Sequence, residues 1–244
     1  MSNVSFQYVE PSTDEAEAFK VMCNKHMQEA SVYDDNFYLT QIFNYLSNTY
    51  DSFTTACKKS LKGKKEEEIT DYIRRNLQNN QAFNLDGFKV NSEARNQDTI
   101  IGYYDLKFEH SLWLNQYFVL ECKPVDSTKT RIDAYIHQAT KNKDDDGGLY
   151  RFLINKYATN KSFGGMLGYI ISNNSDDVIS SLKDKIRSLQ IINNNLTFGN
   201  LLDSQLLETS ITNFKNSFQS NHTRVHENKI IQPIHIFHLF FDFN

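Results

Sequence analysis

The sequence has few of the residues that mark fibrous, disordered or disulfide-rich chains. It contains only three prolines and nine glycines in 244 residues, which argues against a collagen-like or low-complexity protein. Its three cysteines include no CxxC pair, so we expect reduced thiols, a cytoplasmic protein and no structural zinc site. No apolar run approaches the roughly 20 residues that cross a bilayer, and the acidic N-terminus does not resemble a secretory signal. We therefore expect no membrane association.

An excess of positive charge is also missing. The chain carries 26 basic and 30 acidic residues, for a net charge of -4, so its overall charge does not point to nucleic acid. A basic groove can coexist with an acidic total, and a metal site needs acids. At 39% hydrophobic residues, the chain can bury a substantial core.

Hydrophobic spacing divides the chain into two parts. Residues 1–60 are expected to form an N-terminal helical extension, and residues 61–244 the main domain. Within the main domain, helical spacing marks 61–80, 126–143, 149–158 and 176–190, whereas β-branched and aromatic runs mark strands at 88–94, 99–109, 117–123, 164–172 and 230–243. Residues 193–230 are polar, and we expect only short helical pieces there. This order predicts an α/β domain with a mixed central sheet flanked by helices.

Two charged residues end a strongly apolar predicted strand. In YFVLECK, side chains alternate between faces, so Glu121 and Lys123 share one face with Val119. The strand is apolar on both faces up to Glu121, which is typical of a covered central strand. Burying a carboxylate and an ammonium there costs several kcal/mol unless a partner or a metal compensates.

A second carboxylate precedes this strand. If the strands at 99–109 and 117–123 pair as a hairpin, Asp105 lies beside Glu121. A divalent cation would relieve the repulsion between the two carboxylates, and oxygen ligands suit Mg²⁺ or Mn²⁺. Such a metal can activate water at a phosphodiester, and Lys123 would stand within reach of that water.

Asp105 followed by Glu121-Cys122-Lys123 resembles the signature of the PD-(D/E)XK nuclease superfamily, which includes many restriction endonucleases. The resemblance covers residues 64–172 and the last strand. It implies a restriction-endonuclease-like fold in which Asp105, Glu121 and the backbone carbonyl of Cys122 bind the metal. It also implies that Lys123 assists the attacking water. The first-strand motif is Tyr-Asp here rather than Pro-Asp, and residues 1–60 have no counterpart.

The same resemblance implies two further site residues. A glutamate on the first core helix often joins the site, and Glu66 matches best because it shares a helix face with Ile69 and Ile73; Glu67 is the alternative. A glutamine on the helix after the triplet often points inward, which matches Gln138.

The predicted function is Mg²⁺-dependent hydrolysis of DNA phosphodiester bonds. By resemblance, bacterial defence against phage or foreign DNA is a role that many stand-alone members serve. RNA is an alternative substrate, and a homodimer would suit double-strand cleavage. The alternative function is a catalytically inactive nuclease-fold subunit that binds nucleic acid or a protein partner. Bases that would position the backbone are Lys107, Lys129, Arg131 and Lys141.

Each assignment has a purely structural alternative. The strand acids and Lys123 would otherwise form a surface ion pair on an exposed hairpin, which contributes little to stability. Glu66 would be an acid favoured by the helix dipole, and Gln138 a solvent-facing helix residue. The run Lys58–Lys65 would be a solvated basic face rather than a phosphate contact.

Other polar residues are expected to be structural. His235 and His238 are three residues apart on an apolar strand, so they point to opposite faces and share no metal. His222 and His226 have helical spacing without an HExxH pattern. Among the remaining candidates, Cys122 is expected to be a buried thiol rather than a nucleophile paired with His137, and Trp113 to pack at the hairpin loop.

Overall fold

The computed structural model describes residues 34–92, 94–95, 103–136, 147–172, 174–202, 206–207, 214 and 216–244. The chain forms two compact units, Met1–Tyr38 and Leu39–Asn244. Residues 39–60, which the sequence assigned to the helical extension, lie within the second unit. No helix in these described ranges is long and apolar enough to span a membrane.

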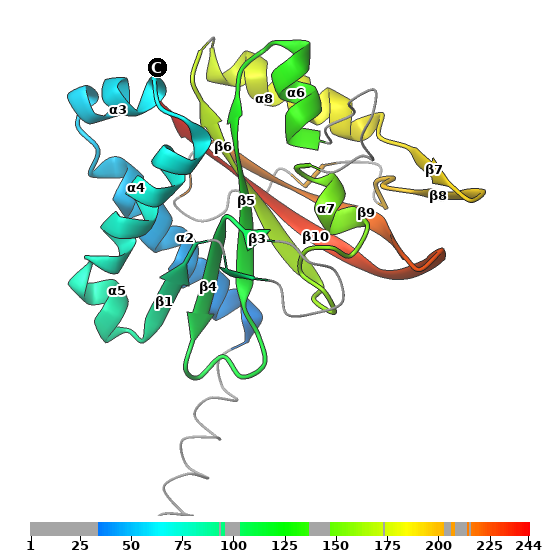
Figure 1. Ribbon diagram of the computed structural model, residues 1–244, viewed down its shortest axis with the longest axis horizontal. Helices are drawn as coiled ribbons and strands as arrows, with labels where there is room; N and C mark the ends of the chain where they lie inside the picture. Colours follow the sequence, from blue (N-terminus) through cyan, green and yellow to red (C-terminus); the bar gives the residue numbers. More distant parts are fainter. Residues whose placement is uncertain are drawn as a thin grey trace, which may run out of the picture. The chain divides into compact units, whose positions relative to one another are not determined.

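Four helices come first in the described chain, and groups of strands and helices follow (Figure 1). The helices are α2 (Asp35–Asp51), α3 (Thr55–Lys62), α4 (Glu66–Gln78), α5 (Gln81–Leu85), α6 (Lys129–Ile136), α7 (Tyr150–Leu153) and α8 (Ser175–Arg187). The strands are β1 (Phe88–Asn91), β2 (Ala94–Arg95), β3 (Tyr103–Tyr104), β4 (Leu106–His110), β5 (Phe118–Val125), β6 (Phe163–Ile170), β7 (Ile191–Asn193), β8 (Leu196–Phe198), β9 (Ser217–His226) and β10 (Lys229–Asp242).

Six strands form the central sheet in the order β1-β4-β5-β6-β10-β9. Strands β5, β6 and β10 are parallel to one another, whereas β1, β4 and β9 each pair antiparallel with their neighbours. The predicted α/β domain with a mixed sheet flanked by helices is therefore confirmed. The expected hairpin is also present, since β4 pairs with β5 through Leu106 and Leu120.

The two faces of the sheet are covered by different helices. On one face, Phe118 of β5 and Phe237 of β10 contact Phe43 of α2. On the other face, Val119 and Met166 belong to a core cluster built with the apolar sides of α6, α7 and α8. Because both faces are covered, β5 is the buried central strand that its sequence predicts, and Glu121 points into the interior between the sheet and these helices.

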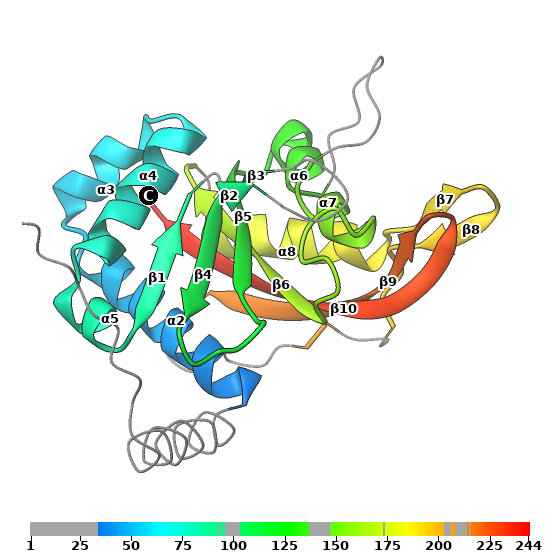
Figure 2. The same ribbon diagram turned by 60° about the horizontal axis from the view of Figure 1, so that its bottom comes forward.

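The expectation of only short helical pieces in residues 193–230 is wrong for the described part of that range. It holds strand β8, which pairs with β7 in a hairpin, and the long strand β9, which lies beside β10 in both views (Figures 1 and 2). His222 and His226 accordingly lie on a strand. The inward positions of β9 include Ser220, His222 and Arg224, all fully buried. Polar residues at buried positions hide the apolar alternation by which a strand is recognised in sequence.

The helix expected over 149–158 is also shorter than predicted. Helix α7 ends at Leu153, and Asn155 and Ala158 adopt positive φ angles of 60° and 51°, which no α-helix accommodates. Trp113, by contrast, packs in the β4–β5 loop as expected, with its ring stacked on Phe163.

A chain of hydrogen bonds satisfies the buried polar residues between β9 and β10. His222 Nδ1 lies 2.8 Å from the carbonyl oxygen of Gly199, which can only accept, so this nitrogen carries the proton. Ser220 Oγ lies 2.7 Å from His222 Nε2 and 2.8 Å from His238 Nε2. His238 Nδ1 meets the hydroxyl of Tyr135 at 2.9 Å. The network is complete with both histidines neutral.

These histidines predict acid sensitivity. Burial lowers the pKa of His222 to about 4 and the pKa of His238 well below its ordinary value. Unfolded histidine takes up a proton near pH 6.5 whereas these stay neutral, so stability is full above about pH 6.5 and falls as the pH drops toward 4. We expect a loss of roughly 3 kcal/mol at pH 4 from His222 alone. Urea unfolding from about pH 7.5 to about pH 4 measures this loss. His222→Gln should flatten the dependence of the unfolding free energy on pH, and the matched variant His226→Gln should leave that dependence unchanged.

Candidate active site

Glu121 and Lys123 lie on one face of β5, as their spacing predicts. Glu121 is fully buried, and Lys123 Nζ stands 2.9 Å from Glu121 Oε1. Only 16% of the Lys123 side chain is exposed, so this is not the surface pair of the structural alternative. Burial alone would lower the pKa of Lys123, but the charges of Glu121, Glu66 and Asp105 outweigh burial and raise the pKa above its ordinary value.

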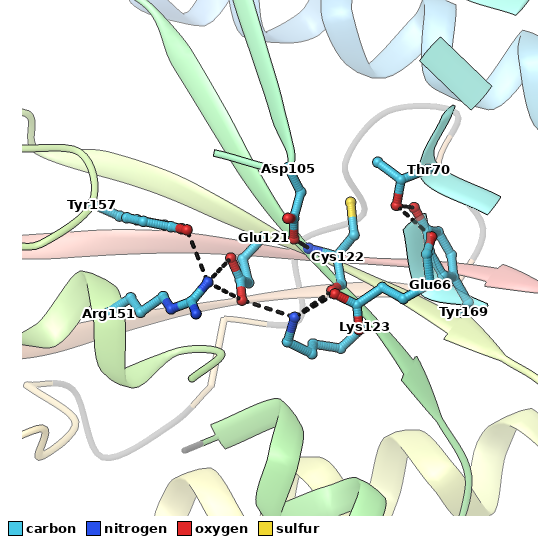
Figure 3. A network of polar contacts seen from close by, with 9 residues as sticks. All are labelled: Glu66, Thr70, Asp105, Glu121, Cys122, Lys123, Arg151, Tyr157 and Tyr169. Carbon is cyan, nitrogen blue, oxygen red and sulfur yellow. Dashed lines mark hydrogen bonds and ion pairs between the residues drawn. The ribbon is translucent and has the colours of Figure 1, made fainter. Parts of the chain in front are cut away.

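Asp105 is the single residue between β3 and β4. Its Oδ2 accepts a hydrogen bond of 2.7 Å from the backbone N–H of Cys122, which ties the carboxylate to β5 beside Glu121 (Figure 3). Burial, followed by the charge of Glu121, raises the pKa of Asp105 to about 8. Near neutral pH this carboxyl group therefore holds a proton unless another cation replaces it.

Glu66 closes the site from the first residue of α4. Its Oε1 is 2.6 Å from Lys123 Nζ, so Glu66 rather than Glu67 reaches the predicted cluster. Burial raises the pKa of Glu66, and the Lys123 ammonium partly offsets that rise. Farther along α4, Thr70 Oγ1 and the Tyr169 hydroxyl of β6 share a hydrogen bond of 2.9 Å. This hydrogen bond links α4 to β6.

The Lys123 ammonium occupies a point where three oxygen atoms converge. Besides Glu66 Oε1 at 2.6 Å and Glu121 Oε1 at 2.9 Å, it donates to the backbone carbonyl of Cys122 at 2.9 Å. Two of these oxygens, from Glu121 and the Cys122 carbonyl, belong to residues that the sequence predicted as metal ligands. The Lys123 ammonium is therefore the cation that these oxygens bind in this structure.

Arg151 of α7 is a site residue that the sequence analysis missed. Its Nη1 lies 2.9 Å and 3.0 Å from the two carboxylate oxygens of Glu121, and it donates to the Tyr157 hydroxyl at 2.8 Å. The sequence signal for Arg151 is a basic residue inside the apolar segment LYRFL. Helical spacing alone could have placed that residue on a solvent-facing side of the helix. The site thus combines three carboxylates with two fixed cations.

An open cleft of about 310 Å³ leads to these residues. It is lined by Glu66, Glu67, Thr70, Asp71, Ser92 and Asp105. Asp105 and Glu66 therefore face space that a ligand can enter, while Glu121 lies behind them.

Two predicted bases pair outside the cluster, and three other residues named in the sequence analysis lie outside the described residues. Gln138, His137 and Lys141 lie outside the described residues. Lys107 pairs with Glu109, and Lys129 pairs with Asp133. The Cys122 side chain is fully buried, and burial raises the pKa of its thiol well above the ordinary value, so it is not an activated nucleophile.

The oxygen donors suit a hard divalent cation, although they do not form a complete coordination shell. Mg²⁺ is usually held by one or two carboxylates with water completing the shell, and Asp105, Glu121 and the Cys122 carbonyl supply such a set. Within the described ranges, however, no group of three or more His, Cys, Asp or Glu side chains is arranged to hold a metal ion. The donor chemistry fits Mg²⁺ or Mn²⁺ provided that Lys123 gives up its place among the oxygens.

No protein-family model matches this chain, and no curated protein or solved structure matches it either. The resemblance to PD-(D/E)XK nucleases stays a prediction based on the motif. What the site can do follows from the chemistry of its own residues.

Proposed function

We propose that this protein is a metal-dependent nuclease that hydrolyses phosphodiester bonds of DNA. The observation that carries the proposal is the convergence of Asp105, Glu121 and Lys123 at one end of a buried strand, beside an open cleft. Buried acids that share a site with a lysine are costly to maintain, and proteins keep such clusters mainly where they bind or react.

Asp105, Glu121 and the Cys122 carbonyl would hold Mg²⁺ or Mn²⁺. When bound, the metal would supply a Lewis acid that lowers the pKa of a coordinated water and neutralises charge on the phosphate. Lys123 would then leave Glu121 and the Cys122 carbonyl, orient the attacking water and offset the negative charge of the transition state. Glu66 would hold the Lys123 ammonium in reach of that water, and Arg151 would keep neutralising Glu121.

A cleavage assay tests the proposal. Supercoiled plasmid, single-stranded DNA and RNA are incubated with the protein in Mg²⁺, Mn²⁺ or EDTA. We expect cleavage of DNA that requires the metal. Lys123→Ala should lower the rate by about 10²–10⁴-fold, because it removes the group next to the reacting water.

Lys185→Ala is the matched control, since this lysine of α8 pairs with Asp133 and lies outside the cluster. Its rate should stay close to that of the wild type. Full activity of Lys123→Ala would remove Lys123 from the mechanism, and intact substrates under all conditions would remove the nuclease proposal.

One observation favours the second candidate, an inactive nuclease-fold subunit. Both carboxylate oxygens of Glu121 already bind Arg151, and one also binds Lys123. If these cations replace the metal permanently, the site is structural. DNA binding without Mn²⁺ binding, measured by calorimetry, and without cleavage would support this candidate.

A further inference from the structure

Arg224 of β9 is a buried cation without an acidic partner among the described residues. Only 1% of the residue is exposed. Its guanidinium donates to the carbonyl oxygens of Lys161 at 2.7 Å, Ala158 at 2.8 Å and Tyr157 at 3.0 Å, and to the side-chain oxygen of Asn155. Burial lowers the pKa of Arg224 to about 10, which still leaves it charged at neutral pH. Burying a charge is expensive unless polar groups compensate, and here all the compensating oxygens belong to one loop.

That loop, residues 154–161, contains three residues with positive φ. Asn155, Ala158 and Asn160 have φ angles of 60°, 51° and 56°. Asparagine tolerates this region, but alanine is strained there. Local hydrogen bonds from the N–H groups of Tyr157 and Lys161 to the carbonyls of Arg151 and Ala158 help to hold the loop. The Arg224 guanidinium adds contacts from outside the loop to three of its carbonyls.

The loop carries Tyr157 to the candidate active site. Tyr157 is 1% exposed, and its hydroxyl accepts the 2.8 Å hydrogen bond from Arg151 Nη1. The Arg151 guanidinium also lies 5.2 Å from the centre of the Tyr157 ring, within the range of a cation–π contact. In Figure 3, Tyr157, Arg151 and Glu121 form a continuous line of contacts that reaches Lys123 and continues to Glu66.

We propose that Arg224 is a positioning residue of this site. By binding the carbonyls of residues 157–161, it fixes Tyr157, which holds Arg151 against Glu121. Arg151 in turn neutralises Glu121, so that Lys123 is not the sole counter-charge of that carboxylate. The release of Lys123 from Glu121 is needed only by a nuclease, so this step rests on the proposed function. The positioning of Arg151 by Tyr157 and Arg224 does not rest on the proposed function.

The first test follows the Arg151 side chain directly. The ¹⁵Nε–¹Hε signal of Arg151 is recorded by NMR in the full chain, with Arg151→Lys to assign it. In Arg224→Met and in Tyr157→Phe, we expect the signal to shift and its exchange with water to become about tenfold faster or more. Arg224→Lys, which keeps a charged donor, should restore part of the protection. An unchanged Arg151 signal in folded Arg224→Met and Tyr157→Phe overturns the proposal.

A matched control separates positioning from loss of stability. Phe218→Leu removes core volume from the same strand, near His238 and Phe240, without touching the loop. It should lower the melting temperature and leave the Arg151 signal in place. If Arg224→Met does not fold, Tyr157→Phe and Arg224→Lys carry the test, because each removes fewer contacts. A signal that moves as much in Phe218→Leu as in these variants also overturns the proposal.

The second test is a double-mutant cycle on Mn²⁺ affinity, measured by calorimetry. Removing the Arg151 cation beside Glu121 should tighten Mn²⁺ binding about three- to tenfold, because a like charge is removed. Arg224→Met should tighten it in the same direction, and Arg224→Met with Arg151→Met should match Arg151→Met alone. Independent, additive effects would contradict action through Arg151. If no variant binds Mn²⁺, the nuclease proposal fails, and the NMR result alone decides the role of Arg224.

Discussion

Replacing Asp105 by asparagine is expected to abolish metal-dependent cleavage and, at the same time, to make the protein more stable at neutral pH. The loss of activity follows from removing a metal ligand and should exceed about 10³-fold. The gain in stability follows from the pKa of about 8 in the folded protein. Unfolded aspartate releases its proton near pH 4, whereas folded Asp105 retains it, so its burial costs more free energy as the pH rises from about 4 to about 8.

Denaturant unfolding as a function of pH measures this effect. Asp105→Asn should be on the order of 1–4 kcal/mol more stable than the wild type at pH 7, and equal to it near pH 4. Asp71→Asn is the control, because Asp71 lines the same cleft but is paired with Arg74 and Arg75. Its ion pairs lower the pKa of Asp71, so its removal should not stabilise the protein. Equal stability of Asp105→Asn and the wild type at pH 7 would contradict the buried, protonated carboxyl group.

Replacing Glu121 by glutamine is expected to have the opposite effect on stability. Glu121 is fully buried and is the partner of both Arg151 and Lys123. Without its charge, Arg151 loses this carboxylate and Lys123 loses one of its two carboxylate contacts. Breaking a buried ion pair typically costs about 3–5 kcal/mol. Cleavage should be lost as completely as in Asp105→Asn, because a second metal ligand is missing.

Chemical unfolding at pH 7 provides the measurement, and Glu109→Gln is the matched control. Glu109 lies on the adjacent strand, pairs with Lys107 and is 41% exposed, so its loss should cost less than about 1 kcal/mol. A Glu121→Gln protein as stable as the wild type would mean that the cations do not depend on Glu121. The two acids of one site are thus expected to change stability in opposite directions, whatever the protein cleaves.

The site residues that the sequence predicted share a local cause. Glu121 and Lys123 are two positions apart on one strand, so their common face follows from the pleat alone. The prediction that Asp105 lies beside Glu121 required only a hairpin between two neighbouring strands. Closing the short loop of such a hairpin costs little conformational entropy. Glu66 was selected because helix spacing put it on the apolar face with Ile69 and Ile73, both of which are buried.

The residues that the sequence did not predict depend on contacts between distant segments. Arg151 was missed because its partner Glu121 is thirty positions away, and no periodicity links the two. Helix α7 ends at Leu153, and the carbonyls of the turn after it bind Arg224, 66 positions beyond Ala158. Strand β9 was missed because its inward residues Ser220, His222 and Arg224 are polar and are satisfied only once β10 and the loop lie beside them.

The sequence by itself determined the class of the domain, the buried central strand, and the acids and lysine at its end, because these follow from periodicity within single strands, helices and hairpins. Only the tertiary structure decided which charges meet. It put the Lys123 ammonium among three oxygens, added Arg151 to Glu121 and turned a loop around Arg224. Electrostatic pairing acts through space, and its energy depends on burial and distance rather than on position along the chain.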